Sequence, residues 1–218
     1  MHAATPERPA QKWNGLEWPG ATVVIMASGQ SLTAEQCAAV LGWRAMDPKG
    51  NGRKTIVINN TFLRAPWADV LYACDGAWWR VHAASVGIIF RGQRWTQDVE
   101  AQREFGVHRI ESQRLPGLGK RPGVIHQGGN GGYQAINLAF QAGARRIILL
   151  GYDMHGTHWH GAHGNGLPNT QAWLYAQWVR NFDRLAADLE AEGVQVVNAT
   201  PGSKLECFPR KALSVALS

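Results

Sequence analysis

The stretch GGNGGYQAINLAFQAGARRIILL, residues 128–150, decides the fold class of this 218-residue chain. After its glycine-rich start, apolar residues recur at helical spacing over residues 133–140. Gly143 is typical of a helix end, and residues 146–150 are typical of a buried strand. A glycine-rich loop before a helix lets a ligand approach the backbone, although the same glycines can serve a flexible turn. The candidate nucleotide-binding residues in this loop are Asn130, Gly131 and Gly132.

The same order of elements occurs near the start of the chain. Residues 22–26 predict a short buried strand, and Thr33 with Gln36 forms the capping-box pattern of a helix that runs to about Leu41. The turn between them presents backbone N–H groups, which is typical of phosphate binding and also of a plain strand-to-helix turn. The candidate nucleotide-binding residues in this turn are Ser28, Gly29, Gln30 and Ser31.

Short polar side chains follow two further predicted strands. Asn59 and Asn60 come after a strand at residues 56–58, and Asp75 comes after a strand at residues 70–74. Such side chains can cap the next helix, or they can bond to a sugar hydroxyl or a base edge. Because the pattern repeats at successive strand ends, we favour nucleotide binding.

A histidine-rich loop follows the strand at residues 146–150. Four of the eight histidines lie between His155 and His163, after Asp153. Open α/β sheets place their chemistry at the carboxyl ends of the strands, and imidazole titrates near neutral pH. Asp153 is a candidate nucleotide-binding residue that either orients a loop histidine or caps the turn. The candidate catalytic residues are His158, His160 and His163.

Strands that alternate with helices predict an α/β fold, with a Rossmann-like, mainly parallel sheet and helices on both faces. We expect a single domain at residues 21–210, preceded by an extension at 1–20 and followed by a tail at 211–218. Residues 91–121 are charged and poorly periodic, which predicts an irregular insertion. Residues 86–90 predict a further strand.

The charge and the cysteines indicate the kind of partner and the compartment. A net charge of +6 and a pI near 9.5 favour anionic partners, such as a nucleotide, a phosphorylated substrate or a nucleic acid. There is no dense Lys/Arg run. The three cysteines are far apart and odd in number, which favours free thiols and a cytoplasmic protein. The first twenty residues lack the apolar core of a signal peptide, and no segment has the length of a transmembrane helix.

The ten tryptophans are spread along most of the chain. We assign most of them to the core and to subunit contacts, which makes a homo-oligomer reasonable. Trp178 belongs to an apolar stripe at helical spacing over residues 174–189, and we assign this stripe to the core.

The order of these motifs resembles that of the bacterial lipooligosaccharide sialyltransferases and of the related 6-hydroxymethylpterin diphosphokinase-like proteins. The turn at residues 28–32, Ser-Gly-Gln-Ser-Leu, resembles their Asn-Gly-Pro-Ser-Leu turn, and Asn59 and Asp75 match their polar strand ends. Residues 130–153 are similar to their loop, helix, strand and Gly-x-Asp segment. Residues 158–163 resemble a His-x-x-Gly-His segment, with one extra residue before His163.

The resemblance covers most of residues 22–205, leaves residues 91–121 unmatched, and leaves open whether the chain is phage-encoded. It implies a transferase that binds a CMP-type sugar donor without an obligatory cofactor and uses His163 or His160 as general base toward a hydroxyl-bearing acceptor. Ser28, Gln30 and Gly131 depart from the family pattern, and the lid tyrosines have no clear counterpart. These departures weaken the prediction of a particular donor sugar more than they weaken the prediction of nucleotide binding.

Other functions fit the same residues. A diphosphokinase would hold Mg²⁺ and ATP through Asp75 and Asp153. A zinc site would use the histidine cluster, although its spacing matches no regular zinc motif. The positive charge allows a transferase that acts on modified bases of DNA. A nucleotide-binding module without turnover would keep only the pocket.

Overall fold

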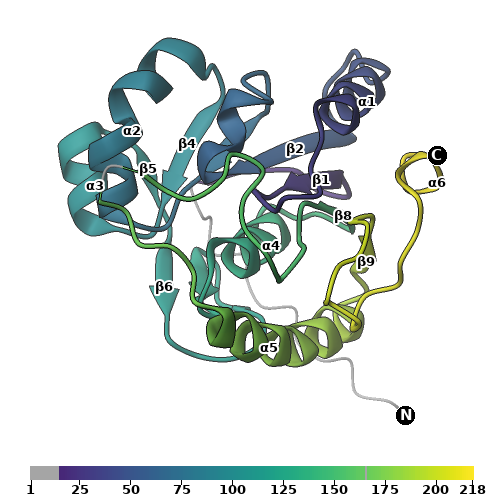
Figure 1. Cartoon of the computed structure of the whole chain (residues 1–218). Coiled ribbons are helices and arrows are strands. Elements are labelled where there is room, and N and C mark those ends of the chain that lie inside the picture. The colour runs from purple at the N-terminus through teal and green to yellow at the C-terminus, as the bar shows by residue number, and fades with distance from the viewer. Residues whose placement is uncertain (1–14, 165) are drawn as a thin grey trace.

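The computed structural model describes residues 15–164 and 166–218, which form a central parallel β-sheet covered by helices (Figure 1). Within these residues the sheet has seven strands in the order β5-β4-β3-β2-β1-β8-β9. Every adjacent pair is parallel. The predicted α/β class with a Rossmann-like sheet is therefore confirmed. The strands are β1 (Thr22–Met26), β2 (Arg53–Ile58), β3 (Val70–Tyr72), β4 (Gln93–Thr96), β5 (His108–Arg109), β8 (Arg146–Leu150) and β9 (Gln195–Asn198).

Helices cover both faces of the sheet, because successive strand residues point to opposite faces. Val23 and Ile25 of β1 pack into one core, and Val24 and Met26 pack into the other. The first core is completed by α4 (Gly131–Gln141) and α5 (Ala172–Ala191). The second core is completed by α1 (Ala34–Ala45), α2 (Gly76–Ile89), the 3-10 helix η1 (Asn59–Leu63), α3 (Val99–Phe105) and α6 (Leu213–Ala216).

Local signals fix the start of α1 and the end of α4 where the sequence predicts them, whereas α1 continues to Ala45, past the predicted end near Leu41. At the start of α1, Gln36 N donates to Thr33 Oγ1 at 3.2 Å, and Thr33 N donates to Gln36 Oε1 at 2.9 Å. This is the predicted capping box. After α4, Gly143 has a φ of 96°, a conformation that favours glycine.

Two predictions about the middle of the chain are wrong. Residues 86–90 belong to the last turn of α2 and its C-cap, because the apolar run lies on a helix rather than a strand. Residues 91–121 are not irregular, since they contain β4, α3 and β5 and so extend the main sheet. They also contain β6 (Glu111–Gln113), which pairs in parallel with β7 (Val124–His126) in a separate two-stranded sheet.

Residues outside the predicted domain also contribute to the core. Leu16 and Trp18, in the predicted extension, are buried in the first core, and Ala216, in the predicted tail, is buried in the second. Among the described residues, no helix combines the length and apolar character needed to cross a membrane.

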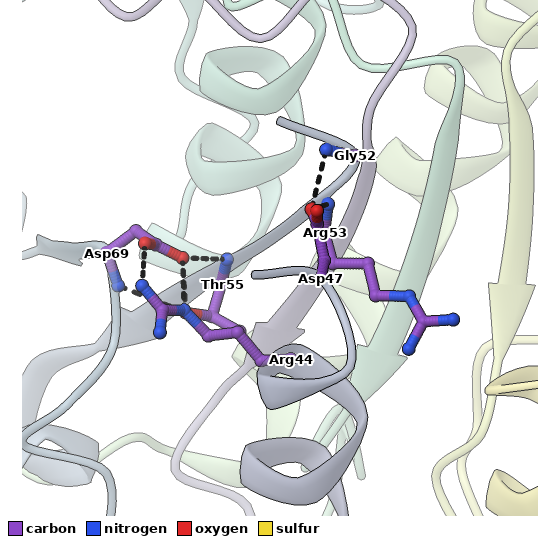
Figure 2. Close-up of polar contacts among 6 residues, drawn as sticks. All are labelled: Arg44, Asp47, Gly52, Arg53, Thr55 and Asp69. Atoms are coloured by element: carbon purple, nitrogen blue, oxygen red, sulfur yellow. Dashed lines mark hydrogen bonds and ion pairs between the residues drawn. The ribbon is translucent and has the colours of Figure 1, made fainter. Parts of the chain in front are cut away.

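Asp69 ties α1, β2 and β3 together at the amino ends of the strands (Figure 2). Its carboxylate accepts hydrogen bonds from Arg44 Nε at 3.1 Å and from Arg44 Nη2 at 2.5 Å. It also accepts bonds from the backbone N–H and the hydroxyl of Thr55, both at 2.8 Å. Asp47 makes a simpler contact nearby, since its carboxylate accepts the N–H groups of Gly52 and Arg53 at a surface turn.

We expect Asp69→Ala to lower the free energy of unfolding by about 2 kcal/mol, because it leaves the Arg44 and Thr55 donors without their partner. Urea denaturation followed by circular dichroism measures the loss. Asp47→Ala is the matched control and should cost less, because water can replace its carboxylate at the surface. Equal losses in the two variants would show that the Asp69 contacts add no more stability than a surface turn.

Candidate functional site

The strand order reverses between β1 and β8, which marks a topological switch point. Ligands of open α/β proteins bind outside the carboxyl ends of the strands at such a point. A cavity of about 570 Å³ lies there, lined by residues that follow β1, β2, β3, β4 and β8 and by the start of α4. This volume lies within the usual range for small-molecule sites.

Ten of the fourteen residues proposed from the sequence line this cavity. They are Ser28, Gly29, Asn59, Asp75, Asn130, Gly131, Gly132, Asp153, His158 and His163. The fold therefore brings together strand ends that lie more than one hundred residues apart in the chain.

The other four residues do not line the cavity, and three of them have structural contacts instead. Asn60 is buried, and its Oδ1 accepts a hydrogen bond from Trp78 Nε1 at 2.7 Å. Ser31 donates to Asp153 through its N–H at 3.0 Å and through its hydroxyl at 2.9 Å. Gln30 is exposed and accepts a bond from Thr157 N at 3.4 Å. The fourth residue is His160.

Gly29 and Asp153 hold the loops after β1 and β8 in close contact. A Cβ on Gly29 would lie 1.9 Å from Asp153 Oδ2, so only glycine fits. Asp153 is buried, and this burial raises the pKa of its carboxyl group despite the two hydrogen bonds from Ser31. Asp153 has two predicted roles, which are to orient a loop histidine or to cap a turn. Its hydrogen bonds support the second role, because they join the loop after β8 to the loop after β1.

Helix α4 points its N-terminus into the cavity. Asn130 is its N-cap, since Asn130 Oδ1 accepts a hydrogen bond from Tyr133 N at 2.9 Å. Gly131 and Gly132 form the first turn, whose N–H groups have no partner within a helix. A Cβ on Gly132 would lie 2.9 Å from Tyr152 Cε1, so the close approach of helix and strand requires glycine there. This end of α4 suits an anionic group.

Three cavity residues carry buried polar atoms without a hydrogen-bond partner in the described structure. These atoms are Asn59 Oδ1, Gln97 Oε1 and Asn130 Nδ2. An unpaired buried polar group costs about 1–3 kcal/mol, so three in one cavity require an explanation. A second cavity of about 530 Å³, at the amino ends of β3 and β4, contains none of these atoms. The unpaired atoms therefore mark the first cavity as the one shaped for a polar ligand.

Backbone strain lies in the same place. Asn59 and Met154 have φ values of 49° and 56°, and they are the two described non-glycine residues with positive φ. Both line the cavity. Strained backbone is retained where the surrounding structure enforces it, and it is common at ligand sites. Asp75 is exposed and makes no side-chain cap bond to α2, although it occupies the N-cap position. Its Oδ2 accepts a hydrogen bond from Cys74 Sγ at 3.2 Å, and the carboxylate is exposed to a ligand.

The three candidate catalytic histidines form one cluster at the edge of the cavity. The ring centroids of His158 lie 5.0 Å from His160 and 4.5 Å from His163, and the last two are 5.2 Å apart. Burial lowers the pKa of all three rings, and the neighbouring histidines lower it further for His158 and His160. The pKa of His160 falls to about 4. The cluster is therefore held in the neutral form near pH 7.

The loop that carries the cluster is anchored to the rest of the fold. Ser28 Oγ lies 3.1 Å from His158 Nδ1, and Trp159 N donates to the carbonyl of Ser28 at 3.0 Å. The guanidinium of Arg64 lies 4.0 Å from the Trp159 ring centroid. These contacts place His158 beside the first loop before any ligand binds.

Several lining residues were not proposed as site residues from the sequence, and four of them have side chains suited to a ligand. Arg114 follows β6 and is the one Lys or Arg among the described lining residues, and Gln97 follows β4. Tyr175 and Trp178 come from α5 and line the cavity. Trp178, in the N-terminal part of the predicted apolar stripe, is therefore not a core residue as predicted. Phe182, further along that helix, is buried as predicted. Because Gln97 follows a strand of the main sheet, correct assignment of β4 would have indicated it.

Comparisons with known proteins do not assign the chain to a family. No protein-family model and no curated protein matches the sequence. Among solved structures, a D-allulose 3-epimerase from Methylomonas sp. in complex with D-allulose is 9% identical over 85% of this chain, with a TM-score of 0.18. The match covers 53% of the epimerase, so the chain spans about half its length. A likeness this weak carries no argument about fold or function.

Proposed function

We propose that this protein is a nucleotide-dependent glycosyltransferase that is similar in mechanism to the sialyltransferases and uses a CMP-type sugar donor. The observation that carries the proposal is the convergence of the unpaired atoms of Asn59, Gln97 and Asn130 on one cavity at the switch point. A nucleotide offers donors and acceptors along its base and sugar that can pair with such atoms. The choice of a sugar donor rests on the resemblance of the motifs.

The cavity offers separate places for the parts of such a donor. The N-terminus of α4 and the side chain of Arg114 suit the phosphate, since both favour negative charge. The amides of Asn59 and Gln97 suit the base edge or the ribose hydroxyls. The rings of Tyr175 and Trp178, which come from α5, provide apolar surface in the cavity lining.

The histidine cluster supplies the proton acceptor for the transfer. The acceptor hydroxyl oxygen bonds to the anomeric carbon of the sugar, and the bond between that carbon and the phosphate oxygen breaks, leaving its electron pair on the phosphate. The hydroxyl proton passes to the cluster, where His158 and His163 line the cavity. N–H groups of α4 and Arg114 stabilise the leaving phosphate.

Diphosphokinase chemistry is less well supported by the same geometry. It requires carboxylates that coordinate Mg²⁺. Both oxygens of Asp153 already accept hydrogen bonds from Ser31, and its pKa is raised by burial. Asp75 alone remains as an exposed carboxylate at this edge of the sheet among the described lining residues.

CMP is expected to raise the melting temperature by about 5–10 °C at one hundred times its Kd, since binding to the native state alone contributes about 2.7 kcal/mol at that concentration. The measurement is a thermal-shift panel of CMP, CDP, UDP, GDP and ATP, each with Mg²⁺ and with EDTA. We expect the CMP shift to persist in EDTA. A shift with ATP only in Mg²⁺ supports the diphosphokinase, and no shift with any nucleotide contradicts the proposal.

The variant Asn59→Gly separates ligand binding from stability. Glycine accepts the φ of 49° at this position and removes the unpaired Oδ1, so the protein without ligand should keep its melting temperature. The CMP shift should fall because the amide is missing. Asn51→Gly is the control, since Asn51 is an exposed turn residue outside the cavity. An unchanged CMP shift in Asn59→Gly would remove Asn59 from the binding site.

A further inference from the structure

The cluster of His158, His160 and His163 has the composition and spacing of a metal site. Each residue offers one ring nitrogen, and these three nitrogens all lie within 4.8 Å of one another. Among the described residues this is the one group of three or more histidine, cysteine or carboxylate side chains gathered so closely. We infer that these three histidines bind a zinc ion.

The distances fit zinc after a small rotation of the rings. An ion at the centre of a triangle with sides of at most 4.8 Å lies no more than about 2.8 Å from each nitrogen. Zinc–histidine bonds are about 2.0–2.1 Å long, so each nitrogen moves inward by less than about 1 Å. The rings already pack against one another at centroid distances of 4.5–5.2 Å. The protein therefore holds three ligands close to their bound positions.

Two of the ligands have the surroundings that metal-binding histidines require. The bond between Ser28 Oγ and His158 Nδ1 leaves Nε2 of His158 for the metal, and such partners fix the ring orientation of metal ligands. Nε2 of His160 is buried and has no hydrogen-bond partner in the described structure. Coordination would satisfy that nitrogen. Zinc binds the neutral form of imidazole.

Three protein ligands leave the fourth zinc position open, which is typical of catalytic rather than structural zinc. His158 and His163 line the cavity, so the inferred ion would lie at its edge. A water molecule bound there can ionise near neutral pH. If the proposed function also holds, His158, His160 and His163 would hold a zinc ion that supplies the base for the acceptor hydroxyl.

The test of the metal site uses zinc alone and needs no nucleotide or activity. Untagged full-length protein, stripped with a chelator and dialysed, is titrated with Zn²⁺ by calorimetry and analysed for bound metal by mass spectrometry. We expect about one zinc per chain. Co²⁺ in its place should give the intense visible absorption of a four-coordinate site.

Single variants assign the ligands. His158→Ala, His160→Ala and His163→Ala should each weaken zinc binding by about 100-fold or more, and Ser28→Ala by about tenfold. His155→Ala is the matched control, because His155 lies in the same loop but its Nε2 bonds to the carbonyl of Gly202. It should bind zinc like the parent chain. Circular dichroism confirms that each variant is folded.

Two results would overturn the inference. The first is a parent chain that binds no zinc at micromolar concentrations. The second is a folded His160→Ala variant that binds zinc as tightly as the parent. Neither result depends on the nucleotide experiment, so the metal site and the proposed transferase activity can fail separately.

Discussion

Gly29→Ala is expected to lower the free energy of unfolding by about 3 kcal/mol or more and to abolish any stabilisation by nucleotide. The added Cβ would lie 1.9 Å from Asp153 Oδ2 and 2.4 Å from the carbonyl oxygen of Gly151. Rotation of Asp153 relieves the first clash only by breaking its two hydrogen bonds to Ser31. The second clash involves backbone directly after β8, which no side-chain rotation relieves. The loops after β1 and β8 must therefore separate.

Gly42→Ala is the matched control for this variant. Gly42 lies in α1, and apart from its chain neighbours and the backbone of its own helix no atom is within 4 Å of the position its Cβ would occupy. Alanine there should stabilise the protein by about 0.5–1 kcal/mol, because it favours the helix. Urea denaturation of both variants should therefore give changes of opposite sign. If Gly29→Ala keeps the stability of the parent chain and its nucleotide shift, the two loops do not need close contact.

The parts of the site that sequence reasoning located are those encoded by short local patterns. The turn containing Gly29, the glycine-rich start of α4 and the histidine loop each follow or precede an apolar run that identifies its neighbouring element. Parallel strands place their carboxyl ends at one edge, so residues such as Asn59 and Asp75 meet without any long-range information.

The parts that were missed depend on contacts between distant segments. An apolar run of five residues suits a strand or a helix, so residues 86–90 were assigned to the wrong element. The short strands β4 and β6 carry few apolar residues, and without them Gln97 and Arg114 have no predicted position. Asn60 bonds to Trp78, whereas the adjacent Asn59 lines the cavity. Only the tertiary structure separates such neighbours.

His160 distinguishes the two roles that the histidine cluster can have in the transfer reaction. A free imidazole base must reach the acceptor hydroxyl, which His158 and His163 can do because they line the cavity and His160 cannot. A zinc site requires all three rings equally. We expect His160→Ala to slow transfer by about 10²–10⁴-fold, as much as His163→Ala, because both remove a ligand of the ion that activates water.

The measurement is kcat for transfer from whichever CMP-type donor stabilises the parent chain, with the nucleotide thermal shift recorded for each variant. The shift should persist while kcat falls, since the variants leave in place the amides of Asn59 and Gln97 that are proposed to bind the nucleotide. His108→Ala is the control, because its ring stacks on Trp95 at a distance of 4.9 Å, outside the cavity at the edge of the sheet. Full activity in His160→Ala with loss in His163→Ala would assign the proton to a free imidazole and exclude zinc from the reaction. Full activity in His158→Ala, His160→Ala and His163→Ala alike would remove the cluster from the chemistry altogether.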